Sequence, residues 1–216
     1  MSFLTKKSNF WCRSRLISIA KRLAYLMVGW LFVGANYSLA PYFQTDPVKL
    51  TPSFIDHAIP FSEHAAWAYL SFFIIIPICF LCASYKNVRW MSFSFMGSGL
   101  LAGICFVVFP TMIEYVAVTT PSISTDLYNK IVATDVELNC FPSLHVALTV
   151  IVVWGAINKQ HWLRTILLMI WGVVICISII QLRRHLFLDL IGGFLLAVGV
   201  GIIVRYCLNK LGNKSN

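Results

Sequence analysis

Long apolar runs separated by short polar segments dominate the chain. A helix needs about 20 mostly apolar residues to cross a hydrocarbon core about 30 Å thick. Six stretches without Lys, Arg, Asp or Glu reach or approach that length. They are residues 23–45, 65–85, 90–113, 138–158, 165–182 and 190–204. The pattern predicts an all-α, polytopic membrane protein with six transmembrane helices.

The first and last runs need interpretation. The last has 15 residues, which cover about 22 Å in a helix, so it forms a span only by including His185 and Asp189. The first follows a basic segment and contains Ser38-Leu39-Ala40, which resembles a signal-peptide cleavage site, but it is longer than a usual signal core. We therefore expect an uncleaved anchor, with a basic N-terminus at 1–22, a transmembrane domain at 23–208 and a tail at 209–216.

Two long polar segments connect the first run to the second and the third run to the fourth. The earlier one carries four prolines, which forbid a continuous helix but leave room for a short one around Phe54-Ile55-Asp56. In the later one, Ser124-Thr125-Asp126 precede apolar residues at helical spacing. We expect a capped helix there, lying along the surface.

The charges follow this arrangement closely. The chain has 17 Lys and Arg against 8 Asp and Glu, a formal charge of +9, which in a soluble protein would suggest a nucleic-acid partner. With the N-terminus inside, 13 cations fall on one side: Lys6, Lys7, Arg13, Arg15, Lys21, Arg22, Lys86, Arg89, Lys159, Arg164, Arg205, Lys210 and Lys214. All eight acids fall on the other. Because Lys and Arg collect on the cytoplasmic side of membrane proteins, both termini are predicted to be cytoplasmic, and no nucleic-acid partner is expected.

Composition narrows the class further. Hydrophobic residues make up 59% of the chain and charged residues 12%, which excludes a soluble or disordered protein. Seven Cys in 216 residues are too sparse for a disulfide scaffold. The pair Cys79 and Cys82 lies inside an apolar run, where two small packed side chains are expected rather than a redox pair. His57, Glu63 and His64 match no standard metal-site spacing, so an interfacial loop is expected there.

Ionisable residues in membrane spans are costly and point to function. Phe141-Pro142-Ser143-Leu144-His145 opens the fourth run, and Arg183-Arg184-His185-Leu186-Phe187-Leu188-Asp189 opens the sixth. Proline suits the first turn of a helix, and Ser143 can cap it, so this helix end offers N–H donors to an anion. His185 and Asp189 are four residues apart and are expected to share one helix face.

Together these residues suit phosphate chemistry. Arg183, Arg184 and the helix end at 142–145 can supply positive charge and N–H donors. A neutral His185 at a helix N-terminus can act as nucleophile, with Asp189 stabilising the charge that develops on it. His145 can then protonate the departing oxygen. The alternative for His145 is a packed residue, for the arginines lipid anchoring, and for Ser143 a plain helix cap.

The two segments resemble the second and third signature motifs of the type 2 phosphatidic acid phosphatase superfamily, six-span enzymes that cleave lipid phosphates without a metal. The resemblance implies that His185 forms a phosphohistidine, that Asp189 supports it and that His145 is the acid. Ile55-Asp56, Ile59-Pro60-Phe61, Trp67-Ala68-Tyr69 and Phe109-Pro110-Thr111 extend the similarity to the branch that contains inositol phosphorylceramide synthases and many bacterial relatives.

The sequence also departs from that family. The third motif usually begins with Ser-Arg, but here Ser178 is followed by Ile179. The first motif, a lysine with an Arg-Pro pair, is not recognisable. Arg183 matches a basic residue in the synthase-like branch, so we expect phosphate binding to have shifted to it.

These expectations define the function to be tested. The leading hypothesis is a lipid phosphatase of the bacterial plasma membrane whose site faces outward, with Pro142, Ser143, Arg183 and Arg184 binding a lipid phosphate substrate and no metal or cofactor. The enzymatic alternative transfers a phosphoryl headgroup to an alcohol. The non-enzymatic alternative is a lipid-binding or transport protein, which His145→Ala and His185→Ala would leave active.

Overall fold

The computed structural model describes the backbone of residues 2–213 and the side chains of residues 16–213. Lys6, Lys7, Arg13 and Arg15 therefore lie outside the described side chains, and Lys214 lies outside the described residues. The long helices are α1 (Ser2–Leu39), α5 (Tyr85–Val108), α8 (Trp162–Gln181) and α9 (Phe187–Asn213). The shorter ones are α2 (Phe54–Ala58), α3 (Ala66–Leu70), α4 (Phe72–Cys82), α6 (Ile123–Thr134) and α7 (Leu144–Ala156).

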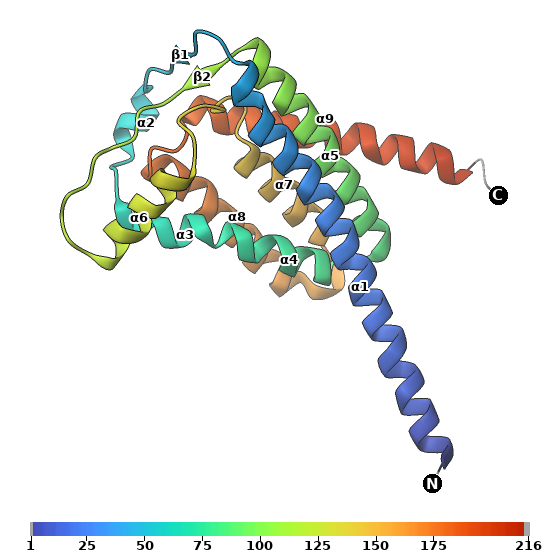
Figure 1. Ribbon diagram of the computed structural model, residues 1–216. Helices are drawn as coiled ribbons and strands as arrows, with labels where there is room; N and C mark the ends of the chain where they lie inside the picture. The colour runs from blue at the N-terminus through green and yellow to red at the C-terminus, as the bar shows by residue number, and fades with distance from the viewer. Residues whose placement is uncertain (1, 214–216) are drawn as a thin grey trace.

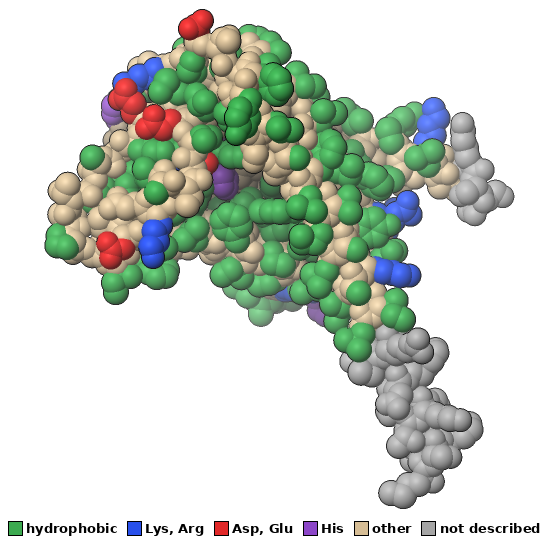
Figure 2. All heavy atoms as spheres, in the orientation of Figure 1, with side chains coloured by type: hydrophobic (Ala, Val, Ile, Leu, Met, Phe, Trp, Pro, Cys, Tyr) green, Lys and Arg blue, Asp and Glu red, His purple; other side chains and the backbone are tan. Residues whose placement is uncertain are grey.

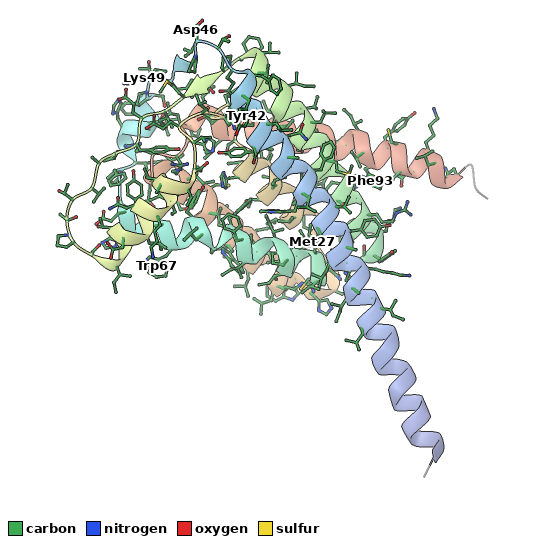
Figure 3. The ribbon with its side chains drawn as sticks, viewed as in Figure 1. Met27, Tyr42, Asp46, Lys49, Trp67 and Phe93 are labelled. Carbon is green, nitrogen blue, oxygen red and sulfur yellow. The ribbon has the colours of Figure 1, made fainter. Side chains whose placement is uncertain are left out.

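Five segments are long and apolar enough to cross a membrane. They are Leu16–Phe43, Glu63–Cys82, Tyr85–Val108, Lys159–Gln181 and Phe187–Asn213. Apolar side chains on the sides of these helices are exposed; Met27 of α1 and Phe93 of α5, labelled in Figure 3, are 50% and 41% exposed. This is the surface expected of a protein that faces lipid rather than water.

The fourth predicted run, 138–158, differs from its prediction. Only Leu144–Ala156 is helical, and its 13 residues cover about 20 Å, less than a membrane requires. Residues 138–143 are not helical, and two of their backbone N–H groups bond elsewhere: Phe141 N donates to Thr111 Oγ1 at 3.0 Å and Ser143 N donates to Asp189 O at 3.0 Å. The sixth span therefore stays a prediction.

Helix α7 forms the centre of the bundle. It contacts α4, α5, α8 and α9, and most of the α7 side chains are buried. Helix α1 packs along α5. Figure 1 shows α7 enclosed by the longer helices. The first turn of α7, which carries the predicted acid His145, is therefore held within the bundle.

The polar loops gather at one end of the bundle (Figure 1). Two short strands, β1 (Val48–Lys49) and β2 (Thr111–Met112), pair in parallel there and join the two long loops. The predicted helices in these loops are present as α2 and α6, although the cap of α6 is Ser122, ahead of the predicted Ser124. Tyr128 of α6 is fully buried and anchors this helix over the end of the bundle.

Close packing between α7 and α9 depends on Gly193. A Cβ at this position would meet the carbonyl oxygen of Ser143 well inside van der Waals contact and would lie 3.0 Å from Val146 Cβ. Neither atom is at the flexible end of a side chain. A larger residue must therefore push the start of α9 away from the start of α7.

We predict that Gly193→Ala lowers the thermal unfolding midpoint of the purified protein, because overpacking costs about 1–3 kcal/mol. Gly199→Ala is the matched control, since a Cβ there meets nothing within 4 Å on the same helix. Unfolding followed by circular dichroism in detergent measures both. Equal midpoints for the two variants would show that the α7–α9 contact is not tight.

Candidate functional site

The structure brings His145, His185 and Asp189 together. The His145 and His185 rings have centroids 5.8 Å apart, and His185 Nδ1 lies 3.5 Å from Asp189 Oδ2. Asp189 is fully buried, and His185 is 6% exposed. Two segments about forty residues apart in the chain thus form one cluster of ionisable groups.

His185 does not share a helix face with Asp189, as the four-residue spacing had predicted. Helix α9 begins at Phe187, and His185 lies in the turn before it. This turn starts where α8 ends: Arg184 N donates to Ile179 O and Arg183 N to Ile180 O, with Arg183 at φ 53°. This is a Schellman helix end with arginine in the left-handed position that glycine usually takes. It redirects the chain and leaves His185 outside α9.

Asp189 connects the two motifs through its backbone and its side chain. Its carbonyl oxygen accepts the Ser143 N–H at 3.0 Å. Its Oδ2 accepts the Leu186 N–H at 2.8 Å, and this bond caps the first turn of α9. The same oxygen faces His185 Nδ1. Its Oδ1 is buried and has no hydrogen-bond partner among residues 16–213. The carboxylate is therefore fixed in place and retains acceptor capacity for the imidazole.

His145 is held by aromatic neighbours. Its Nε2 is 2.9 Å from the Tyr69 hydroxyl, and its ring packs against those of Tyr69 and Phe72. Its own carbonyl oxygen accepts a hydrogen bond from the Thr149 hydroxyl at 2.7 Å. Tyr69 was not predicted as a site residue, because a tyrosine in an apolar run carries no spacing signal toward a histidine 76 positions away.

Arg184 is the arginine that enters the cluster. Its side chain is 3% exposed, its Nη2 pairs with the Asp135 carboxylate, and its guanidinium lies 3.9 Å from the Tyr115 ring centroid. Its Nε and Nη1 are buried without a partner in the described part of the chain. Since buried arginine donors are normally satisfied, two open donors indicate a place for an anion. Arg184 is also close enough to His145 to act on it electrostatically.

Asp135, at the end of α6, holds Arg184 in place. Its second oxygen accepts a hydrogen bond from the Tyr37 hydroxyl of α1 at 2.6 Å. Burial alone would raise the pKa of this carboxyl, but the Arg184 charge and the Tyr37 hydroxyl outweigh burial and lower it. Asp135 is therefore ionised at neutral pH and neutralises part of the Arg184 charge. Neither Asp135 nor Tyr37 was predicted as a site residue. The sequence does not show which residue of a loop will lie opposite which residue of a distant span.

Arg183 points away from the cluster. Its Nη1 donates to Asp56 O at 2.7 Å and its Nη2 to Ile59 O at 2.9 Å. Asp56 in turn accepts the Phe187 N–H at 2.7 Å. Arg183 thus fastens the loop around α2 to the start of α9, whereas its neighbour Arg184 enters the cluster.

Ser143 and Pro142 lie at the base of the site. Both are buried, and the Ser143 Oγ caps α7 by accepting the Val146 N–H at 3.4 Å. Pro142 precedes this cap, so it lies outside the first turn in which it was predicted. Apart from Val146, whose N–H bonds to this cap, the first N–H groups of α7 have no acceptor within the helix.

A cavity of about 270 Å³ leads to His145 from the side of the bundle. Apolar side chains of α1, α4 and α7 form most of its wall, and its polar part consists of Tyr37, Tyr69, Thr134, Asp135 and His145. Figure 2 shows histidine surface within a hollow bordered by apolar side chains. The polar cluster is therefore reached along an apolar path.

The two histidines of the segment between α1 and α3 lie elsewhere. His64 Nδ1 is 2.9 Å from Ser124 Oγ and joins the segment before α3 to α6. His57 is exposed on α2. Neither residue reaches the cluster around His145, as expected of interfacial loop residues.

Comparison with known families identifies the chain. A family model described as the PAP2 superfamily matches residues 43–203, which include all the site residues described above except Tyr37. No curated protein and no solved structure matches the chain. Since the match covers most of the sequence, the chain belongs to the PAP2 superfamily.

Proposed function

We propose that this protein is a membrane lipid phosphatase that works through a phosphohistidine on His185. Membership of the PAP2 superfamily supports phosphatase or phosphotransferase activity on lipid phosphates. The observation that carries the finer assignment is the meeting of His145, His185 and Asp189 beside a buried arginine with two open donors. These are the parts required to bind a phosphate, attack it and protonate its leaving group.

The reaction follows from the positions of these groups. Arg184 Nε and Nη1 and the first turn of α7 bind the phosphate oxygens. His185 Nε2 forms a bond to phosphorus as the bond from phosphorus to the alcohol oxygen breaks, and that oxygen takes a proton from His145. Asp189 stabilises the positive charge on the His185 ring through Nδ1. The leaving oxygen takes the place of the Tyr69 hydroxyl at His145 Nε2.

The second step regenerates the enzyme. His145, now neutral, removes a proton from the incoming hydroxyl as its oxygen forms a bond to phosphorus and the bond to His185 breaks. Water as acceptor releases inorganic phosphate. The same geometry serves an alcohol, because the chemistry at phosphorus is identical and only the acceptor differs.

One observation favours transfer to an alcohol as a second candidate function. Asp135 and Tyr37 line the cavity beside His145, where a carboxylate and a hydroxyl can hold the hydroxyl groups of an acceptor. A carboxylate repels the dianionic phosphate, so its presence beside the phosphate site suits a neutral polyol. This arrangement supports a reaction similar to that of the inositol phosphorylceramide synthases, which transfer a headgroup.

The apolar wall of the cavity supports a lipid substrate. Its opening lies among α1, α4 and α7, at the side of helices that face hydrocarbon. The loop end, which contains the cluster, also holds all eight acids and four cations, while the other 13 cations belong to the opposite end and the termini. By the charge rule, we propose that the site faces the extracytoplasmic side of the membrane, with both termini in the cytoplasm.

The decisive experiment compares the wild type with His185→Ala on a panel of lipid phosphates, with and without inositol as acceptor. Removing the nucleophile is expected to lower turnover roughly a thousandfold or more. Free phosphate supports the phosphatase, and a new phospholipid supports the transferase. His57→Ala is the matched control, being an exposed histidine remote from the cluster.

Substrate labelled with ³²P adds a direct readout. Acid-labile, base-stable label on the wild type, absent from His185→Ala, is expected of phosphohistidine. Wild-type turnover by His185→Ala would refute the assignment.

We predict that His145→Ala discriminates between leaving groups. A general acid matters most when the departing alcohol is a strong base. The variant should lose roughly 100-fold or more on an alkyl phosphate but much less on the corresponding p-nitrophenyl ester, whose leaving group needs no proton. A uniform loss on both esters would contradict a role as general acid.

We predict that substitution of Arg184 lowers mainly activity, whereas substitution of the adjacent Arg183 lowers mainly stability. Arg184→Gln removes the open donors and should lower kcat/KM on lipid phosphates by roughly 100-fold, with the folded protein retained. Arg183→Gln should lower the unfolding midpoint, because Asp56 O and Ile59 O lose their donors, while its effect on kcat/KM stays smaller. Kinetics and melting curves on both variants test this assignment, and the reverse pattern would overturn it.

A further inference from the structure

A second cavity, of about 770 Å³, lies at the end of the bundle opposite to the candidate site. It is formed between the start of α5 and the end of α9, which Figure 1 shows at the far side from α2 and α6. Its lining includes Lys86 and Arg89 of α5 and Arg205 of α9. Tyr85, Asn87 and Asn209 add hydroxyl and amide groups to the same wall.

Within the described part of the chain, the three cations have no acidic partner. None of the ion pairs formed by the described side chains includes Lys86, Arg89 or Arg205, and no acid lines the cavity. Figure 2 shows the acidic side chains at the loop end, away from the blue side chains at this end. The cavity therefore combines three positive charges that no acid among the described side chains neutralises.

Arg205 is held in position by aromatic rings. Its guanidinium lies 4.3 Å from the Trp90 ring centroid and 5.0 Å from that of Trp154. Trp90 is itself fixed, because its Nε1 donates to Gly201 O at 2.8 Å. Stacking on two indoles orders the arginine before any ligand binds, which lowers the entropic cost of binding.

The surroundings indicate the kind of anion. The cavity lies where membrane-spanning helices end, at the depth of lipid headgroups. The nearby side chains of α9 on the lipid side are apolar and exposed: Ile202, Ile203, Tyr206 and Leu211. A ligand that fits both features has an anionic head and apolar chains.

We propose that this cavity binds the headgroup of an anionic phospholipid in the leaflet opposite to the catalytic site. Lys86, Arg89 and Arg205 bind the headgroup phosphate, and the exposed apolar side of α9 contacts the acyl chains. Basic pockets at the ends of membrane helices bind such headgroups by charge complementarity. This proposal is independent of the reaction at His185.

The test measures lipid retained by the purified full-length protein in mixed micelles of phosphatidylglycerol and phosphatidylcholine, by native mass spectrometry. The wild type is expected to retain phosphatidylglycerol preferentially. Lys86→Gln/Arg89→Gln should reduce this preference at least about tenfold, since each cation contributes roughly a fivefold factor. Lipid in the catalytic cavity contributes equally to both proteins, so the difference isolates this site.

Controls separate the alternatives. Lys159→Gln removes a cation at the same end of the bundle that does not line the cavity, and it should leave the preference unchanged. Arg205→Gln, with its unfolding midpoint measured, tests the stacked arginine separately. Equal retention by the wild type and the double variant, an equal loss in Lys159→Gln, or displacement of the lipid by millimolar inorganic phosphate would each overturn the proposal.

Discussion

The site depends on Asp189 more than on any other residue. Its backbone carbonyl bonds to Ser143 N, and its carboxylate caps α9 and faces His185. One residue thereby joins the start of α7 to the start of α9 and places its carboxylate 3.5 Å from an imidazole that belongs to neither helix. Gly193, one helical turn further along α9, permits the close approach that these bonds require. Burying a carboxylate lowers the stability of the fold unless the carboxylate forms hydrogen bonds. The bond from Leu186 N therefore helps to keep Asp189 in its buried position.

The second constraint is the buried charge on Arg184. Asp135, Tyr37 and Tyr115 come from three separate segments, and they enclose the guanidinium without satisfying all its donors. A protein selected only for stability would close such a gap, since unpaired buried donors cost about 1–3 kcal/mol each. Here the open donors are near the histidines, so the destabilising feature coincides with the place where we propose that a phosphate binds. In that proposal, the loss of stability and the binding of substrate have the same structural cause.

The limits of the sequence follow from the range of the interactions. Apolar runs and charge asymmetry are local signals, so the sequence could predict the membrane-spanning runs and the long loops. It could also predict that His145, His185 and Asp189 act together. The turn at His185 was not, because the left-handed arginine that creates it has no glycine to mark it. For the same reason the sequence favoured Arg183 as the phosphate ligand, whereas the turn sends the Arg183 guanidinium to a loop and the Arg184 guanidinium into the cluster.

The polar residues that surround the histidines could not be predicted from the sequence either, because their contacts are long-range. Tyr69, Asp135 and Tyr37 reach the site across 49 or more positions of sequence, and nothing in their own surroundings distinguishes them from other tyrosines and acids. Only α7, at the centre of the bundle, brings them together. Its shortness is part of this arrangement: a helix of full membrane length would place its first turn at the surface, in contact with water. Because α7 is short, His145 lies below the loops and beside a mostly apolar cavity, which is the position that the proposed lipid phosphate substrate requires.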